Sequence, residues 1–476
     1  MRNDQETLSL KRRVLVLAIC CTSLLVVSMD NTIVNVALPA IRADLQASIT
    51  GLQWTIDAYT LVLACFLMLA GATGDRLGRK RTFQVGLAVF GLGSLLCSLA
   101  PSIGWLVAAR AVQGIGGTML NPVAMSIITN VFTDPRERAR AIGVWGSVVG
   151  IALGLGPVLG GLLTETVGWR AIFWVNVPVV LVAIAATARY VPESRAPHAR
   201  RPDPVGQILV VVLLASVVTG VIEAPRAGWT SPLIIGLGVL AVVALVALLM
   251  WERRRREPLI ELRFFSSVPF SSATVVAVCA FAAFGSFLFL STLYLQEVRG
   301  LSAFEAGLAL LPAAVTATVC APLSGRWVAT RGPRTSLVIA GIATTLVAVV
   351  IAQVGPTTPL WVLLAAYAVF GIGFGLVNPP ITNTAVSGMP RSQAGVAAAV
   401  ASTSRQVGQS LGVAVSGTVV ATAATVGTGL SAAWWVVGAA TLVIGVLGVL
   451  ATTARADATA DRVADLFAEE ATPARL

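Results

Sequence analysis

The residues of this sequence that could take part in chemistry are charged side chains that lie inside long apolar stretches. Asp30 and Arg110 have apolar neighbours on both sides, and Asp30 is followed closely by Thr32 and Asn35. On insertion scales an Asp at the centre of a membrane helix costs about 2.5–3.5 kcal/mol. Asp30 must therefore pair, face a water-filled cavity, or hold a proton for part of a cycle. The last option is proton coupling, and the alternative is a structural hydrogen bond to Thr32, Asn35 or a neighbouring helix.

The depth of Arg110 should be close to that of Asp30. Asp30 follows Arg13 by 17 residues, and a helix rises about 1.5 Å per residue. Arg110 lies about eight residues into a helix that starts on the opposite side of the membrane, so the two side chains could interact. An arginine stays charged, so Arg110 could tune the proton affinity of a nearby carboxylate. The alternative is a permanent structural ion pair.

Two further charges are candidates for contact with a substrate or cation. Asp57 is shallower than Asp30, and it could attract cations at the outer mouth of a path or be a solvated acid at a helix start. Arg405 lies mid-stretch among Ser, Thr and Gln residues. A polar patch at that depth predicts a cavity or a buried network. Arg405 could contact substrate or brace its own part of the molecule, and the sequence leaves both open.

Composition identifies the setting of these charges. The 476 residues are 56% hydrophobic and 12% charged, with a mean hydropathy of +0.86. Soluble domains carry about 25% charged residues. Apolar runs of about 20 residues, enough to span a bilayer, recur along the chain between short polar connectors. We therefore expect a polytopic, all-α membrane protein and not a soluble enzyme.

The sequence lacks suitably placed residues for disulfide, metal, hydrolytic or nucleotide-binding chemistry. The six cysteines lie in apolar runs and the single histidine, His198, lies in a connector, so we expect no disulfide, no metal site and no catalytic triad. Neither Lys11 nor Lys80 follows a glycine, so the sequence lacks the Gly-Lys-Ser/Thr motif of a phosphate-binding loop. The net charge of +11 belongs mainly to connectors, which fits membrane topology better than nucleic-acid binding. We therefore expect no cofactor and no ATP as the energy source.

The apolar runs predict fourteen transmembrane helices in a 6 + 2 + 6 arrangement. The corresponding domains are residues 14–190, an inserted pair at 206–250, and 270–452. Basic residues favour one side of this topology, which places both termini in the cytoplasm and leaves Arg42, Arg170, Arg226 and Arg299 outside. The expected spans are 14–36, 54–73, 82–100, 104–130, 141–163, 170–189, 206–223, 232–250, 270–296, 304–325, 335–352, 359–382, 395–422 and 432–452.

An internal repeat supports two parallel halves. The connector 71–80 follows the second helix, and 325–334 follows the second helix of the last six, with both pairs of glycines aligned. Ala329 stands where the first copy has Asp75. Two such halves with a substrate path between them at the bilayer midplane are the architecture of secondary transporters.

These motifs together resemble the major facilitator superfamily, and within it the fourteen-helix drug:proton antiporters of the quaternary-ammonium, quinolone and methylenomycin type. The resemblance rests on segments 29–39, 71–81, 109–114 and 150–161, in that order, and on 256–265 and 404–408. It covers nearly the whole chain. No single segment is specific to this family, but the occurrence of these segments in this order is.

The resemblance implies roles for several residues. Asp30 would carry the proton and Arg110 would tune it. Asp75 and Arg79 would latch the halves while the pump is open to the outside, although a solvated turn is an alternative. Glycines recurring every fourth residue permit close helix packing, and a proline bends a helix, which suggests a hinge or, alternatively, ordinary small-residue packing. The hinge residues are Gly150, Gly154, Gly156, Pro157 and Gly160.

The expected function is proton-coupled export of amphipathic or cationic drugs across the bacterial plasma membrane by alternating access. The partners would be a small-molecule drug, protons and the lipid bilayer, and the protein would be a monomer. A dedicated exporter of one metabolite or antibiotic is the main alternative. A non-transporting membrane sensor and a nutrient symporter are further alternatives, and the glycine–proline helix disfavours the symporter.

Overall fold

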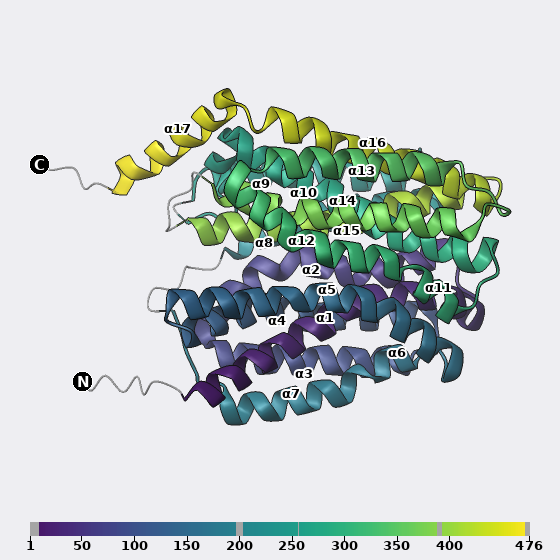
Figure 1. The fold of residues 1–476 in the computed structure, drawn as a ribbon, viewed down its shortest axis with the longest axis horizontal. Helices are drawn as coiled ribbons and strands as arrows, with labels where there is room; N and C mark the ends of the chain where they lie inside the picture. The colour runs from purple at the N-terminus through teal and green to yellow at the C-terminus, as the bar shows by residue number, and fades with distance from the viewer. Residues whose placement is uncertain (1–8, 197–202, 256, 388–392, 472–476) are drawn as a thin grey trace, which may run out of the picture.

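Long helices, roughly parallel to one another, form the computed structural model of the chain (Figure 1). It describes residues 9–196, 203–255, 257–387 and 393–471, and within these ranges the regular elements are all helical. His198 and Arg256 lie outside the described residues. Leu10, where α1 begins, and Leu450, where α16 ends, lie at the same end of the bundle (Figure 1). We call this the near end and the opposite one the far end.

The first seven helices pack on one another and form an N-terminal group, the lower part of Figure 1. Most of their starts are capped by Ser or Asp side chains that accept hydrogen bonds from the backbone of the first turn, which satisfies orphan N–H groups. The helices are α1 (Leu10–Leu45), α2 (Ile49–Leu77), α3 (Arg79–Ser98), α4 (Ile103–Val131), α5 (Pro135–Thr166), α6 (Ala171–Trp174) and α7 (Asn176–Tyr190).

The C-terminal group packs in the same manner and occupies the upper part of Figure 1. It consists of η1 (Leu262–Ser266), α10 (Val268–Leu293), η2 (Tyr294–Val298), α11 (Ala303–Ala309), α12 (Leu311–Arg331), α13 (Arg334–Ala352), α14 (Leu360–Val386), α15 (Ala394–Thr422) and α16 (Val426–Leu450). A final helix, α17 (Ala454–Ala471), lies at the near end, where Phe467 packs against Phe264.

A hairpin of α8 (Pro204–Ala227) and α9 (Pro232–Glu252) lies against both groups, because α8 contacts α2 and α15. The Gln207 side chain donates a hydrogen bond of 2.6 Å to the Cys65 carbonyl. Near the other end of α8, Glu223 accepts 2.8 Å from the Trp54 indole. The Thr418 hydroxyl donates 2.8 Å to the Val221 carbonyl. Thus α8 is bonded to α2 in two places and to α15 in one.

Thirteen helical segments of the described chain are long and apolar enough to cross a membrane. The remaining expected span, 395–422, coincides with α15, whose 29 residues include many polar side chains and which is not among the thirteen. The expected count of fourteen is therefore not confirmed. Several helices extend beyond their apolar cores. The expected start of the fifth span at residue 141 differs from the observed start at Pro135, because Asp134 caps the helix there.

Candidate functional site

Asp30 and Arg110 form an ion pair in the interior of the N-terminal group. The exposed fractions of the two side chains are 0% and 1%. The guanidinium also donates 3.0 Å to the Thr55 carbonyl through Nε and 2.7 Å to Gln113 Oε1 through Nη1. It lies 4.3 Å from the ring centroid of Tyr59, a geometry in which an aromatic face attracts a cation. The expectation that Asp30 and Arg110 meet at one depth agrees with this geometry.

Neutral side chains complete the coordination of the pair. Gln113 Nε2 donates 2.8 Å to Asp30 Oδ1 and 3.2 Å to Ser94. Asn176 Nδ2 lies 3.5 Å from the same Asp30 oxygen and donates 3.0 Å to Ser94. A buried ion pair is tolerated when further hydrogen bonds satisfy its remaining polar atoms. The arrangement therefore holds a carboxylate and a guanidinium in contact where neither can reach bulk water.

Sequence reasoning missed these neutral partners. Gln113 could have been found, because it follows Arg110 by three residues and so shares its helix face. Ser94 and Asn176 belong to α3 and α7, and their inward orientation depends on how those helices are rotated in the bundle. No local pattern in the sequence fixes that rotation.

Asp57 is buried in α2, where this helix packs against α15. Its Oδ1 accepts 3.2 Å from the Thr60 hydroxyl, and Ser410 of α15 is close to the same carboxyl group. Its Oδ2 is a buried oxygen without a hydrogen-bond partner in the described chain. Of the two readings from the sequence, the solvated acid at a helix start is wrong, because the side chain is 0% exposed.

Asp75 and Arg79 form an ion pair of 2.8 Å across the turn from α2 to α3. Gly78 makes this turn with φ of +116°, a conformation that disfavours residues with a side chain. Arg79 also reaches the Ser126 carbonyl of α4 at 3.5 Å. In the described part of the chain, the hydrogen bonds of both side chains stay within the N-terminal group. The structure therefore places the expected latch residues together at the near end, where their described hydrogen bonds are confined to the N-terminal group.

The expected hinge glycines of α5 face two different neighbours. A Cβ atom at Gly156 or Gly160 would meet Thr32 or Ile33 of α1. A Cβ atom at Gly150 would lie 2.6 Å from the Thr318 hydroxyl of α12. At Gly154 the nearest atom is the Ala314 methyl, at 3.7 Å, again on α12. Pro157 lies inside α5, which continues as one helix through it. Helix α5 thus packs closely on both groups through separate faces.

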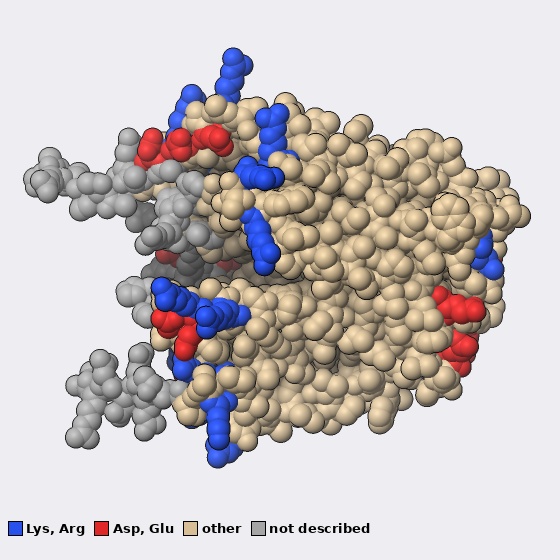
Figure 2. Space-filling model, viewed as in Figure 1, with Lys and Arg blue, Asp and Glu red and all other residues tan. Residues whose placement is uncertain are grey.

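Contacts between the two groups concentrate at the far end. Arg42 of α1 donates two hydrogen bonds of 2.8 Å to the Glu297 carboxylate of η2. Gln296 donates 2.8 Å to the Val36 carbonyl. Gln53 of α2 donates 2.7 Å to the Ala414 carbonyl of α15. At the near end the surface is hollowed between the groups (Figure 2). The described chain is thus closed at the far end and open at the near end.

Arg405 of α15 lies beside a row of phenylalanines in the C-terminal group. Its Nη2 donates 2.5 Å to the Thr382 hydroxyl of α14, and its guanidinium carbon lies 5.8 Å from the Phe281 ring centroid. Two stacked ring pairs continue the row, Phe284 with Phe374 at 4.4 Å and Phe287 with Phe370 at 4.1 Å. The expected polar patch around Arg405 is therefore joined to an aromatic one.

Comparisons with known proteins agree with this architecture. The sequence profile of the Major Facilitator Superfamily matches residues 20–413. The multidrug resistance protein Stp of Mycobacterium tuberculosis is 36% identical over 399 residues, which cover 84% of this chain and 74% of that protein. The methylenomycin A resistance protein of Streptomyces coelicolor is 36% identical over 84% of each chain.

A third relative is the puromycin resistance protein of Streptomyces alboniger, 39% identical over 85% of this chain and 81% of that protein. Among solved structures, a mutant peptide transporter POT in complex with sulfate superposes with a TM-score of 0.69 over 94% of this chain and 95% of that one. The two sequences are 14% identical, so this likeness concerns the fold. The chain belongs to the Major Facilitator Superfamily and is a multi-pass membrane transporter, not an enzyme.

Proposed function

We propose that the protein exports drugs or antibiotics across the bacterial plasma membrane in exchange for protons, by alternating access. Relatives named for multidrug, methylenomycin A and puromycin resistance support export of such compounds. The near end would face the cytoplasm, with both termini there. Lys and Arg side chains gather at this end (Figure 2), as they do on the cytoplasmic side of membrane proteins.

The observation that carries the proton-coupling part is the buried pair of Asp30 and Arg110. A proton that binds Asp30 would remove the ion pair, while Arg110 would keep its hydrogen bonds to Thr55 and Gln113 and its contact with Tyr59. Arg110 would therefore keep polar partners, although not its counter-ion, when the carboxyl group is protonated. Asp30 would carry the proton and Arg110 would set how tightly it is held.

The conformational change would move two domains, residues 14–190 and 270–452, against each other, with the pair at 206–250 between them. Opening of the far end must break the hydrogen bonds that Arg42, Gln53 and Gln296 make to the other group. Closure of the near end would bring Asp75 and Arg79 against the C-terminal group. Helix α5, which packs on both groups, would act as the hinge at Gly150, Gly154, Gly156, Pro157 and Gly160.

Transport into everted membrane vesicles tests this proposal. A fluorescent dye that enters vesicles when a pH gradient is imposed demonstrates proton antiport. We expect Asp30→Asn to abolish gradient-driven uptake. Asp44→Asn, which neutralises an exposed acid at the far end, is the matched control and should transport normally. Gradient-driven uptake by folded Asp30→Asn would exclude Asp30 as the proton carrier, and no movement of any dye by the native chain would contradict drug antiport.

A dedicated exporter of one antibiotic is the second candidate, because relatives include proteins named for resistance to methylenomycin A or puromycin alone. Cells that express the chain can be challenged with a panel of structurally unrelated toxic compounds. Protection against several of them supports the multidrug reading, and protection against a single compound supports the dedicated exporter. Asp57 and Arg405 would be the candidate contacts of a cation or substrate in either case.

A further inference from the structure

The charge of Arg405 has no counter-ion in the described chain. Its nearest polar partners are two hydroxyl groups, Thr382 at 2.5 Å and Ser402 at 3.5 Å, and its Nε is a buried nitrogen without a hydrogen-bond partner. A guanidinium carries five N–H donors, so several remain available. An arginine in a membrane span normally pairs or faces a water-filled cavity. In the described chain, the Arg405 guanidinium therefore lacks the counter-ion that a charge in a membrane span normally has.

The guanidinium lies beside polar, exposed positions of a membrane-spanning helix. Thr382 and the adjacent Asn383 are exposed polar residues within membrane-spanning α14. Polar side chains in such helices face the bundle interior or an aqueous cavity, not lipid. Arg405 is eleven residues beyond Ala394, where α15 starts, so it is about 16 Å from the near end. That depth is beyond the phospholipid headgroups and leaves a mobile solute as the natural counter-ion.

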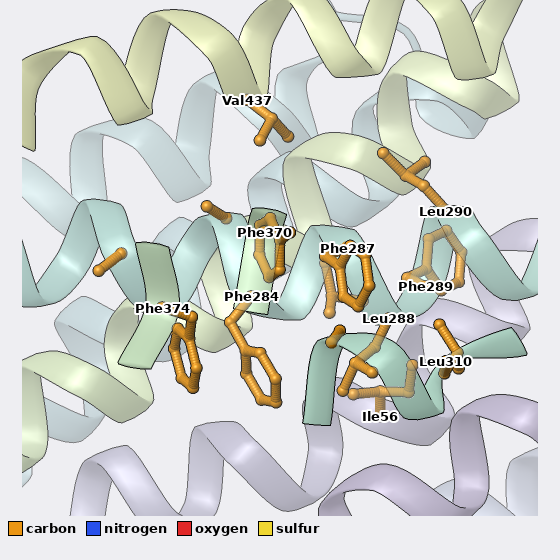
Figure 3. Packing of buried hydrophobic residues seen from close by; sticks show 14 of the residues in the cluster. Ile56, Phe284, Phe287, Leu288, Phe289, Leu290, Leu310, Phe370, Phe374 and Val437 are labelled. Carbon is orange, nitrogen blue, oxygen red and sulfur yellow. The ribbon is translucent and has the colours of Figure 1, made fainter. Parts of the chain in front are cut away.

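A row of largely buried aromatic side chains extends from Arg405 toward the far end. Phe284, Phe287, Phe370 and Phe374 line a small cavity that is closed on its other side by Leu153 and Pro157 of α5. In Figure 3 the rings of Phe284 and Phe374 point toward helices of the N-terminal group. Along α10, Phe281 and Phe287 are six residues apart, or about 9 Å. Phe287 and Phe370 are 1% exposed and belong to the core, so an aromatic molecule with one end at the guanidinium would contact Phe281, Phe284 and Phe374.

The acids Asp30 and Asp57 are 0% exposed, whereas Arg405 is partly exposed and so more accessible to a solute. Asp30 is already paired with Arg110, and Asp57 is buried between α2 and α15. Guanidinium groups bind carboxylates and other anionic oxygens through charge-assisted hydrogen bonds, often two at once. Aromatic faces supply stacking and apolar contact. Both recognition elements therefore fit a planar aromatic compound with an anionic oxygen.

We propose that Arg405 and the phenylalanine row, Phe281, Phe284 and Phe374, form a subsite for planar aromatic substrates that carry a carboxylate or phenolate. This deepens the proposed export function and rests on it. The subsite differs from the cationic preference expected from the sequence. Arg405 contacts the anionic oxygen, and the phenylalanine rings contact the aromatic body of the substrate.

Two dyes that share one aromatic scaffold test the charge preference. Fluorescein is an anionic xanthene, and tetramethylrhodamine methyl ester is a cationic one. Their binding to the purified full-length chain in detergent is followed by fluorescence anisotropy. In Arg405→Gln we expect fluorescein to bind about 10- to 100-fold more weakly, the usual effect of losing hydrogen bonds to a charged group. Binding of the rhodamine should be unchanged or tighter.

Two variants serve as controls. Arg405→Lys keeps the charge and should restore part of the fluorescein affinity. Arg331→Gln removes an exposed arginine at the near end of α12 and should bind both dyes like the native chain. Phe281→Ala should weaken both dyes, since it removes aromatic contact alone. Equal weakening of both dyes in Arg405→Gln, or unchanged fluorescein affinity, overturns the proposal.

A competition experiment needs no variant and so avoids any folding defect. Naphthoate should displace fluorescein from the native chain, and naphthylmethylammonium should not. Displacement by the ammonium compound alone overturns the subsite. Vesicle transport separates this failure from failure of the export function. If the rhodamine is transported by the pH gradient and fluorescein neither binds nor moves, export stands and the subsite is wrong. If neither dye moves although both bind, export itself is contradicted.

Discussion

Arg42 and Glu297 connect the two groups of helices by a bidentate ion pair, with both carboxylate oxygens 2.8 Å from the same guanidinium nitrogen. The pair joins α1 to η2 at the far end, where the groups are in contact. It is partly exposed, and exposed ion pairs contribute about 0.2–1 kcal/mol. This contact is therefore strong enough to bias the closed state and weak enough to break in each cycle.

Glu297→Gln is predicted to open the far end more often, because it removes that bias. A loss of about 1 kcal/mol corresponds to a shift of roughly fivefold in the conformational equilibrium. The buried far-end residue Ala306 can be replaced by cysteine, and its labelling by a membrane-impermeant maleimide added on that side should accelerate up to about fivefold. Asp44→Asn is the control, since Asp44 pairs with Arg170 within the N-terminal group. Unchanged labelling in Glu297→Gln would show that the pair does not hold the far end closed.

Gly161→Ala is predicted to impair transport by disturbing far-end closure. A Cβ atom at Gly161 would collide with the backbone of Ala303 and lie 2.7 Å from the Phe304 Cα, both in the other group. Gly146→Ala is the matched control in the same helix, since nothing lies within 4 Å of its added Cβ. We expect slower dye uptake with a near-normal melting temperature in Gly161→Ala, and normal uptake in Gly146→Ala. Equal uptake by both variants would contradict the assignment.

Gly156→Ala should instead reduce stability. Its Cβ would collide with the Thr32 hydroxyl of α1, in the same group as α5. Overpacking of this kind costs about 1–3 kcal/mol. The expected result is a lower melting temperature of the purified protein. The double variant Gly156→Ala with Thr32→Ala removes the colliding hydroxyl and should recover most of the loss. No recovery would place the defect elsewhere.

Single substitutions of the buried pair are predicted to be destabilising and non-additive. Asp30→Asn leaves the Arg110 charge unpaired, and Arg110→Gln leaves the Asp30 carboxylate unpaired. Breaking a buried pair by removing one partner costs about 3–5 kcal/mol. The double variant leaves no unpaired charge and should unfold at a smaller cost than the sum of the singles. Free energies of unfolding in mixed micelles measure this coupling. Additive effects would mean that the two side chains do not stabilise each other.

Asp75→Asn should affect transport far more than stability. The pair with Arg79 is partly exposed, with 16% of the Arg79 side chain and 36% of the Asp75 side chain accessible, so its loss should cost at most about 1 kcal/mol. If Asp75 latches the near end in the opposite conformation, dye uptake should fall sharply while the melting temperature stays within a few degrees. Glu137→Gln, which removes another near-end ion pair, with Arg13, is the control. Normal uptake by Asp75→Asn would argue for a solvated turn.

The parts of the fold that sequence reasoning predicted are those set by local pattern. Apolar runs gave the order of the helices, and helical rise placed Asp30 and Arg110 at one depth. The ends of helices were less predictable, because caps such as Asp134 extend α5 beyond its apolar part. The number of spans also depends on α15, whose polar residues weaken its hydropathy signal.

The site was predictable only where its residues are close in sequence. Asp75 and Arg79 are four residues apart, and they pair across the turn from α2 to α3. The contact of Arg405 with Phe281 and Thr382 brings three helices together, and no spacing within one segment indicates it. Glu297 meets Arg42, 255 residues away in sequence, and this contact follows from the docking of the two groups.

Because α8 lies against one side of the molecule, the two sides present different surfaces to the bilayer. One seam between the groups runs along α2 and α15, and α8 lies over it with hydrogen bonds to both helices. The other seam runs along α5 and the helices α11 and α12. A lipophilic compound diffusing within the membrane would meet α8 before the first seam, and it would meet α5, α11 and α12 directly at the second. The hairpin thus gives the two flanks of the molecule different access from the lipid.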